Sequence, residues 1–171
     1  MDAKQAVKEK KQEFLKQWFK ATIETYPQES ARILGKDADR FDNPVGAVTR
    51  ETLEKVLDLL SDQASRETLE KALDPLIRIR AVQAFSAADA VSFIFALKTI
   101  GDTLIEPDQL IDFYRMVDDI ALAGFNKLLK CKEEIFLLKA TESKRRIHRA
   151  FERAGLVAEL KEEDLLGSYK S

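Results

Sequence analysis

The chain has 171 residues, of which 45% are hydrophobic and 34% charged, with only six glycines and four prolines. This composition excludes collagen, low-complexity disorder and a turn-rich all-β fold, and the length is that of one domain. The net charge of −2 is unlike the basic balance of a general nucleic-acid binder, so we expect no nucleic-acid partner. We also expect a cytoplasmic chain without membrane insertion, because no targeting segment or long apolar run is visible and the single cysteine fits a reducing compartment.

The N-terminal third is predicted to form three helices. Apolar residues recur every three, four and seven positions over 2–26, which indicates one amphipathic helix that ends before the first proline. A short helix over 28–34 is predicted to end at Gly35 in a left-handed cap. Asn43 followed by proline is typical of a helix start, and this helix is predicted to run to about Leu60.

Two further helices are predicted in the middle of the chain. The first covers 65–84 and contains Pro75, which we expect to kink the helix; the alternative is a second helix capped by Asp74. The second covers 86–100, begins at a serine cap and is apolar on nearly every side, so we expect it at the centre of a bundle. Gly101 is predicted to end it.

The longest predicted helix starts near Glu106 and runs to Arg153, a length of about 70 Å at the usual helical rise. Its apolar residues alternate by four and three, the spacing of a heptad repeat. This repeat comprises Leu110, Tyr114, Val117, Ala121, Gly124, Leu128, Cys131, Ile135 and Leu138. A single domain rarely covers such a stripe.

We therefore expect a protein interaction surface that includes Leu110, Val117, Leu128, Ile135 and Leu138, and a homodimer is one form of it. The competing possibility is that the first helix folds across the stripe and completes a monomeric bundle. The whole sequence is interpreted as an all-α bundle of about six helices with a long C-terminal helix. Residues 1–158 are assigned to a single domain and residues 159–171 to a polar tail.

Most catalytic chemistry lacks its residues in this sequence. The chain has one histidine, His148, which lies within the basic run 144–149, and one cysteine, Cys131, which lies on the heptad stripe. Neither a zinc-binding motif, a di-iron motif nor a glycine-rich phosphate loop is present. We therefore expect no metal, no haem, no cofactor and no enzymatic activity.

The most unusual segment is the junction between the two middle helices, where arginines interrupt an apolar run. In one interpretation, Arg78, Arg80, Gln83 and Ser86 form an anion or ligand pocket together with free backbone N–H groups. In the other, Arg80 pairs with an internal carboxylate or caps carbonyl oxygens and so locks the junction. The sequence leaves both interpretations open.

The same junction carries a family signature. It reads Arg80-Ala-Val-Gln-Ala-Phe-Ser86, followed by Ala90-Val91, Phe93-Ile-Phe95 and Leu97-Lys98, with Trp18, Tyr26-Pro27 and Phe41-x-Asn-Pro-Val-Gly46 upstream. These residues resemble the RsbRD N-terminal domain family, the sensory N-terminal region of RsbT co-antagonist proteins in bacterial stress signalling. The resemblance covers about 14–151. No catalytic residues are carried over from this family.

The resemblance implies a sensory or regulatory interaction domain of bacterial signalling. A STAS domain often follows this domain in the family; because this chain ends at Ser171, we expect a stand-alone form that acts by protein contact. One alternative is a small-ligand sensor with an apolar pocket lined by Phe85, Phe93, Phe95 and Trp18. Another, implied by stand-alone relatives, is an accessory protein of a sulfur-metabolism redox complex.

Overall fold

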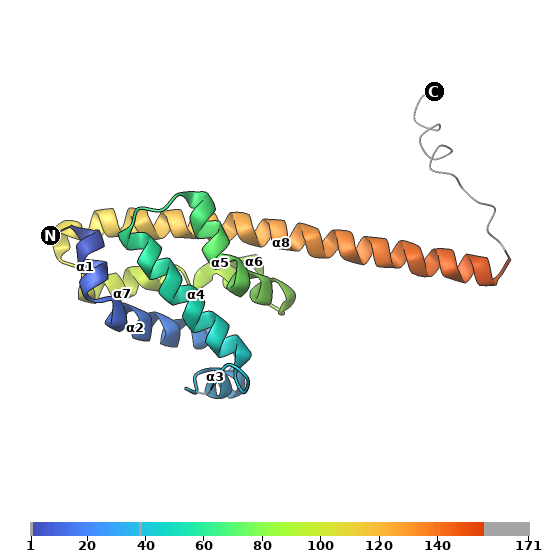
Figure 1. Ribbon diagram of the computed structural model, residues 1–171, viewed down its shortest axis with the longest axis horizontal. Helices are drawn as coiled ribbons and strands as arrows, with labels where there is room; N and C mark the ends of the chain where they lie inside the picture. Colours follow the sequence, from blue (N-terminus) through green and yellow to red (C-terminus); the bar gives the residue numbers. More distant parts are fainter. Residues whose placement is uncertain (1, 38, 156–171) are drawn as a thin grey trace, which may run out of the picture. The chain divides into compact units, whose positions relative to one another are not determined.

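The computed structural model describes residues 2–37 and 39–155, and it divides into two compact units, Met1–Lys132 and Glu133–Ser171. Within the described residues all regular structure is helical, as predicted (Figure 1). The elements are α1 (Ala3–Glu9), α2 (Lys11–Ile23), α3 (Gln28–Leu34), α4 (Pro44–Ser61), α5 (Arg66–Val82), α6 (Ala87–Ser92), α7 (Ala96–Leu104), the 3-10 helix η1 (Pro107–Gln109) and α8 (Leu110–Arg153). The all-α fold with a long C-terminal helix is confirmed. The expected tail, 159–171, lies outside the described residues.

Side-chain caps fix the predicted helix starts. The Asn43 carboxamide accepts a hydrogen bond from the Gly46 N–H at 3.0 Å, and the Ser86 hydroxyl accepts one from the Asp89 N–H at 3.1 Å. Each cap satisfies a backbone donor that the first helical turn leaves without a partner. Pro75 lies inside the continuous helix α5, so the predicted continuation through this proline is confirmed.

Two predictions about the N-terminal third are wrong. The single helix expected over 2–26 is divided at Lys10, where ψ is 17°, into α1 and α2. The Lys10 ammonium donates a hydrogen bond to the Leu104 carbonyl at 2.6 Å, which ties this break to the end of α7. Gly35 has φ −78° and ψ −8°, so it stays in the right-handed helical region, and its N–H bonds to the Ala31 carbonyl at 2.9 Å.

The helix expected over 86–100 is also divided, into α6 and α7. At the break the Trp18 indole N–H donates to the Phe93 carbonyl at 2.8 Å, so a buried tryptophan replaces the missing backbone partner. Gly101 does not end the helix as predicted; it lies within α7. A Cβ at this position would lie 2.3 Å from the Phe113 ring, so the glycine permits α7 and α8 to approach closely.

The core of the first unit is built around α4, which packs against α1, α2 and α5, while α7 packs against α2 (Figure 1). The Phe14 and Phe113 rings, 5.6 Å apart, join α2 to α8. Phe93 and Leu97 are almost fully buried, which agrees with a central position for this segment. The described part of the second unit is the remainder of α8, which ends at Arg153 before Gly155 in a left-handed conformation with φ 68°.

Candidate functional site

Arg80 is the only arginine among the described residues that is fully buried, and its guanidinium binds backbone carbonyls. Its Nε donates to the Ala90 carbonyl at 2.8 Å and its Nη2 donates to the Asp89 carbonyl at 2.9 Å. Both Nη atoms lie 3.1 Å from the Thr25 hydroxyl. The side chain therefore links the end of α5 to α6 and to the turn after α2.

Aromatic rings enclose the same guanidinium. Its central carbon lies 4.3 Å from the centroid of the Phe85 ring, 5.1 Å from that of Phe93 and 5.3 Å from that of Tyr26. Burial lowers the pKa of Arg80 below its usual value, although a guanidinium stays protonated at physiological pH. This geometry matches the interpretation in which Arg80 caps carbonyl oxygens and locks the junction.

The other residues of the predicted anion pocket have separate partners. The Tyr26 hydroxyl donates to the Gln83 carboxamide oxygen at 3.0 Å. The Ser86 hydroxyl donates to the Asp89 carboxylate at 2.7 Å, which places a negative charge where an anion was expected. Arg78 lies on the exposed side of α5, where its Nε bonds to the Asp74 carboxylate at 2.9 Å. Arg78, Arg80, Gln83 and Ser86 thus each bond to partners of their own.

The predicted heptad stripe is divided between buried and exposed residues. Val117 and Leu128 are buried within the first unit, and Leu110 and Ile135 are half-buried. Leu138 is 67% exposed. Of the stripe up to Cys131, Val117, Gly124, Leu128 and Cys131 are therefore buried by the chain itself.

Beyond Cys131, large apolar side chains of α8 are exposed. The exposed fractions are 71% for Phe136, 64% for Leu137, 67% for Leu138, 56% for Ile147 and 49% for Phe151. Between Lys139 and Arg153 the sequence has six basic residues and two acidic ones. The second unit therefore presents an apolar and basic helical surface to solvent.

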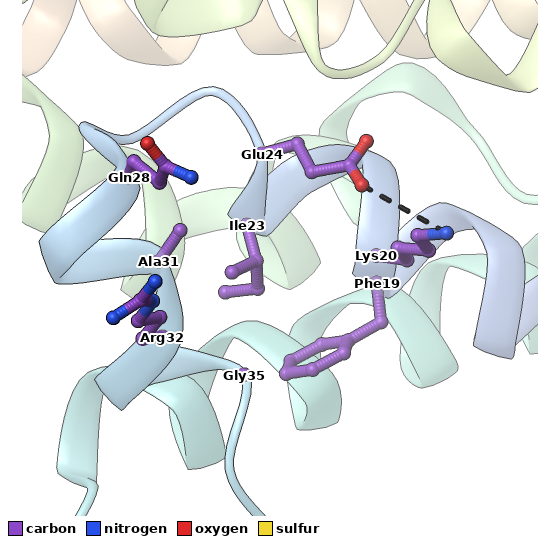
Figure 2. Close-up of a pocket in the computed structure, with 8 residues that line it drawn as sticks. All are labelled: Phe19, Lys20, Ile23, Glu24, Gln28, Ala31, Arg32 and Gly35. Atoms are coloured by element: carbon purple, nitrogen blue, oxygen red, sulfur yellow. Dashed lines mark ion pairs between the residues drawn. The ribbon is translucent and has the colours of Figure 1, made fainter.

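A hollow of about 350 Å³ lies between α2 and α3 (Figure 2). Its α2 side carries Phe19, Lys20 and Ile23, with Glu24 just after the helix, and its α3 side carries Gln28, Ala31 and Arg32, with Gly35 at one end. The Lys20 and Glu24 side chains form an ion pair at 3.9 Å. We call this space the α2–α3 hollow.

A larger hollow of about 700 Å³ adjoins it and shares Phe19, Lys20, Glu24 and Gly35. It adds Lys16 and Arg50, together with the apolar side chain of Ile100. The Arg50 guanidinium lies 4.2 Å from the centroid of the Phe19 ring, so a cation covers the apolar surface that both hollows share.

Asn43 and Gly46 hold α3 in place beside these hollows. The Asn43 amide nitrogen donates to the carbonyls of Leu34, at 2.8 Å, and Lys36, at 3.2 Å. A Cβ on Gly46 would lie 2.6 Å from the Leu34 carbonyl oxygen, so only glycine permits this approach. The start of α4 thereby fixes the end of α3.

Sequence reasoning missed both hollows. Trp18 and Phe93, two of the residues expected to line a ligand pocket, are instead buried and stacked on each other with ring centroids 6.2 Å apart. Phe95 is 47% exposed. Arg32 and Arg50 gave no signal because isolated arginines on polar helix faces are common.

Two kinds of feature are absent from the described residues. None of the helices there combines the length and apolarity that crossing a membrane requires. The same part of the chain has no group of three or more histidine, cysteine, aspartate or glutamate side chains arranged to hold a metal ion.

Comparison with known proteins identifies a family. The family model of the RsbT co-antagonist protein rsbRD N-terminal domain matches residues 12–142. The chain belongs to this family. Searches of the curated proteins and of the solved structures gave no match.

Four of the residues that carried the resemblance to the RsbRD N-terminal domain family connect helices in the structure. Trp18 bonds to the break between α6 and α7, Tyr26 bonds to Gln83, and Asn43 joins α4 to α3. Arg80 joins α5 to α6. Four residues in the signature of this RsbRD N-terminal domain therefore hold helix junctions together.

Proposed function

We propose that this RsbRD N-terminal domain is a sensory or regulatory, non-enzymatic domain of bacterial signalling, and that it binds an acidic partner protein through Glu133–Arg153. Family membership supports the regulatory role. The observation that carries the docking surface is the exposure of the large apolar residues in this segment. Contiguous exposed apolar surface of this kind is typical of interaction sites.

The sequence Ile135-Phe136-Leu137-Leu138 contributes four consecutive apolar side chains to the docking surface. Successive residues of an α-helix point about 100° apart, so these four side chains surround the helix. The last three are more than 60% exposed. A single helix packed on one side covers only some of them, so a partner that surrounds the segment fits better than a simple two-helix pair.

Charge identifies the chemistry of the partner. The six basic residues that follow the apolar cluster are Lys139, Lys144, Arg145, Arg146, Arg149 and Arg153, against Glu142 and Glu152. Two copies of such a segment side by side in parallel would repel each other. An acidic surface on a different protein is attracted instead and associates faster at low ionic strength.

The test begins with a photo-reactive amino acid at position 136 in the producing bacterium, with position 12, an exposed site on α2, as the control. The protein cross-linked from position 136 is identified by mass spectrometry, purified and titrated against the purified domain. We expect Phe136→Asp to weaken binding by about tenfold or more, because it puts a charge in a buried apolar contact. Gln12→Asp adds the same charge at an exposed polar position of α2, outside the docking segment, and should change affinity by about twofold or less.

Two results would contradict the proposal. One is binding of the purified partner that Phe136→Asp leaves unchanged. The other is a light-scattering mass twice the monomer value of 19.4 kDa that falls to one monomer in Phe136→Asp, because this would assign the surface to a second copy of the chain.

A further inference from the structure

We propose that the α2–α3 hollow, together with the hollow beside it, binds a small carboxylate with an apolar tail, such as a medium-chain aliphatic acid. This inference concerns the first unit and does not rest on the partner-binding role of the second. It follows from three features: an apolar floor, an excess of cations around that floor, and a volume suited to a small molecule.

The floor consists of carbon surface from α2 and α3. Phe19 and Ile23 are only 7% and 4% exposed, yet both line the hollow, and Ala31 faces them from α3 (Figure 2). Gly35 adds no side chain at the end of the space. Each methylene group that a ligand buries on such a surface strengthens binding by about fourfold, so an apolar tail is favoured over a bare anion.

The charged groups around the floor favour an anion. Within the described part of the chain, Lys16, Arg32 and Arg50 form no ion pair, whereas most other arginines of the first unit do. Of the two carboxylates that line these hollows, Glu24 pairs with Lys20 and Glu13 accepts a hydrogen bond from Gln17 at 2.7 Å. An arginine binds a carboxylate through two parallel hydrogen bonds, so Arg32 and Arg50 are the residues that we assign to the ligand's head group.

The size of the hollow favours a small molecule. Its volume of about 350 Å³ lies at the lower end of the range that ligand pockets occupy. Two helices wall it, and the hydrogen bonds from Asn43 to the Leu34 and Lys36 carbonyls hold one of them in place. The site is therefore formed before a ligand arrives.

The position of the hollow connects it to the Arg80 junction. Ile23 and Glu24 line the hollow, and the next two residues, Thr25 and Tyr26, bond to Arg80 and Gln83. A ligand in the hollow restrains the end of α2, from which these contacts are made. Occupancy should therefore stabilise the junction as well as the hollow.

Sodium octanoate is the probe, titrated into the purified full-length protein by isothermal titration calorimetry. Acetate provides the charge without the tail, and 1-octanol provides the tail without the charge. We expect saturable octanoate binding, with acetate and octanol each weaker by about tenfold or more. Octanol binding as tight as octanoate, or no saturation by octanoate below about 10 mM, would overturn the proposal.

Two matched double variants locate the site. Arg32→Gln/Arg50→Gln removes both assigned arginines, and Arg146→Gln/Arg149→Gln removes the same charge from exposed positions in α8. We expect octanoate affinity to fall by about tenfold or more in the first and by about twofold or less in the second. Equal affinity in the two variants would overturn the assignment. Because all four arginines are exposed, both variants should fold, and emission from the buried Trp18 verifies this.

Discussion

At the residue scale, the buried guanidinium of Arg80 contributes most clearly to the structure. Its hydrogen bonds reach Thr25, Asp89 and Ala90, which lie on both sides of it in the sequence. The sequence alone marked Arg80 as unusual but left two interpretations open, because Thr25 lies 55 positions away and its proximity depends on the fold. Local patterns do not contain that information.

Replacing Arg80 by leucine should lower the free energy of unfolding by about 3 kcal/mol, because two buried carbonyl groups and a hydroxyl lose their donor. Arg78→Gln is the control: its side chain is half-exposed and its ion pair lies within one helix, so we expect a loss below about 1 kcal/mol. Urea titrations followed by tryptophan fluorescence measure both. Equal losses in the two variants would show that the Arg80 junction is not a principal stabilising contact.

Leu97 tests the predicted central position of α7. Its side chain is fully buried, so Leu97→Ala should lower the free energy of unfolding by about 2–5 kcal/mol through lost burial and a residual cavity. The urea midpoint measures this change. An unchanged midpoint would mean that the helix does not form part of the cooperative core.

At the element scale, a set of ion pairs joins α5 to α8. The Glu70 carboxylate accepts hydrogen bonds from Lys130 at 2.7 Å and from Asn126 at 3.1 Å, and Asp74 pairs with Lys127 and Arg78. Hydrogen bonds from Lys130 and then Asn126 lower the pKa of Glu70 below 4.5. Burial alone would raise the pKa of Asp74, but the bonds and charges of Lys127 and Arg78 outweigh it and lower that pKa below 3.8.

Lowered pKa values in the folded state mean that the unfolded chain binds more protons at acidic pH. This part of the stability is therefore present above pH 4.5 and is lost as the pH falls through the folded-state values. Glu70→Gln/Asp74→Asn should show a smaller loss of unfolding free energy between neutral and acidic pH than the wild type.

The control for this pH dependence is Glu67→Gln/Asp112→Asn, which removes one glutamate and one aspartate from highly exposed pairs. Urea titrations at several pH values should show that this variant loses as much unfolding free energy between neutral and acidic pH as the wild type does. The role of the α5–α8 pairs would be contradicted if Glu70→Gln/Asp74→Asn lost as much unfolding free energy at acidic pH as the wild type.

Sequence periodicity predicted the helices well but not their breaks. Lys10 and Phe93 carry no breaking signal, since lysine is a good helix former and phenylalanine is tolerated in helices. The breaks depend on distant partners, the Leu104 carbonyl for Lys10 and the Trp18 indole for Phe93. At Gly101 the error was the reverse, because the glycine was predicted to end a helix. It lies within the continuous helix α7, where the absence of a side chain makes room for the Phe113 ring.

At the scale of the whole molecule, the sequence predicted that the long helix needs a cover but not where the cover ends. The heptad spacing is the same before and after Cys131, while burial changes there. The hollows between α2, α3 and α4 could not be predicted at all. They depend on how far apart helix faces lie, which the pattern of apolar residues along one helix does not specify.

Cys131 is the last buried residue of α8 and is only 2% exposed. It is also the single cysteine of the sequence, so its thiol reacts with an aromatic disulfide reagent only when this part of α8 separates from its neighbours. The labelling rate of the unmodified protein, compared with that of the urea-unfolded chain, therefore gives the free energy of this local opening. We expect labelling to be slow in the wild type and faster in Glu70→Gln/Asp74→Asn, which loosens α8 from α5. Wild-type labelling as fast as that of the unfolded chain would mean that this end of the first unit is open for most of the time.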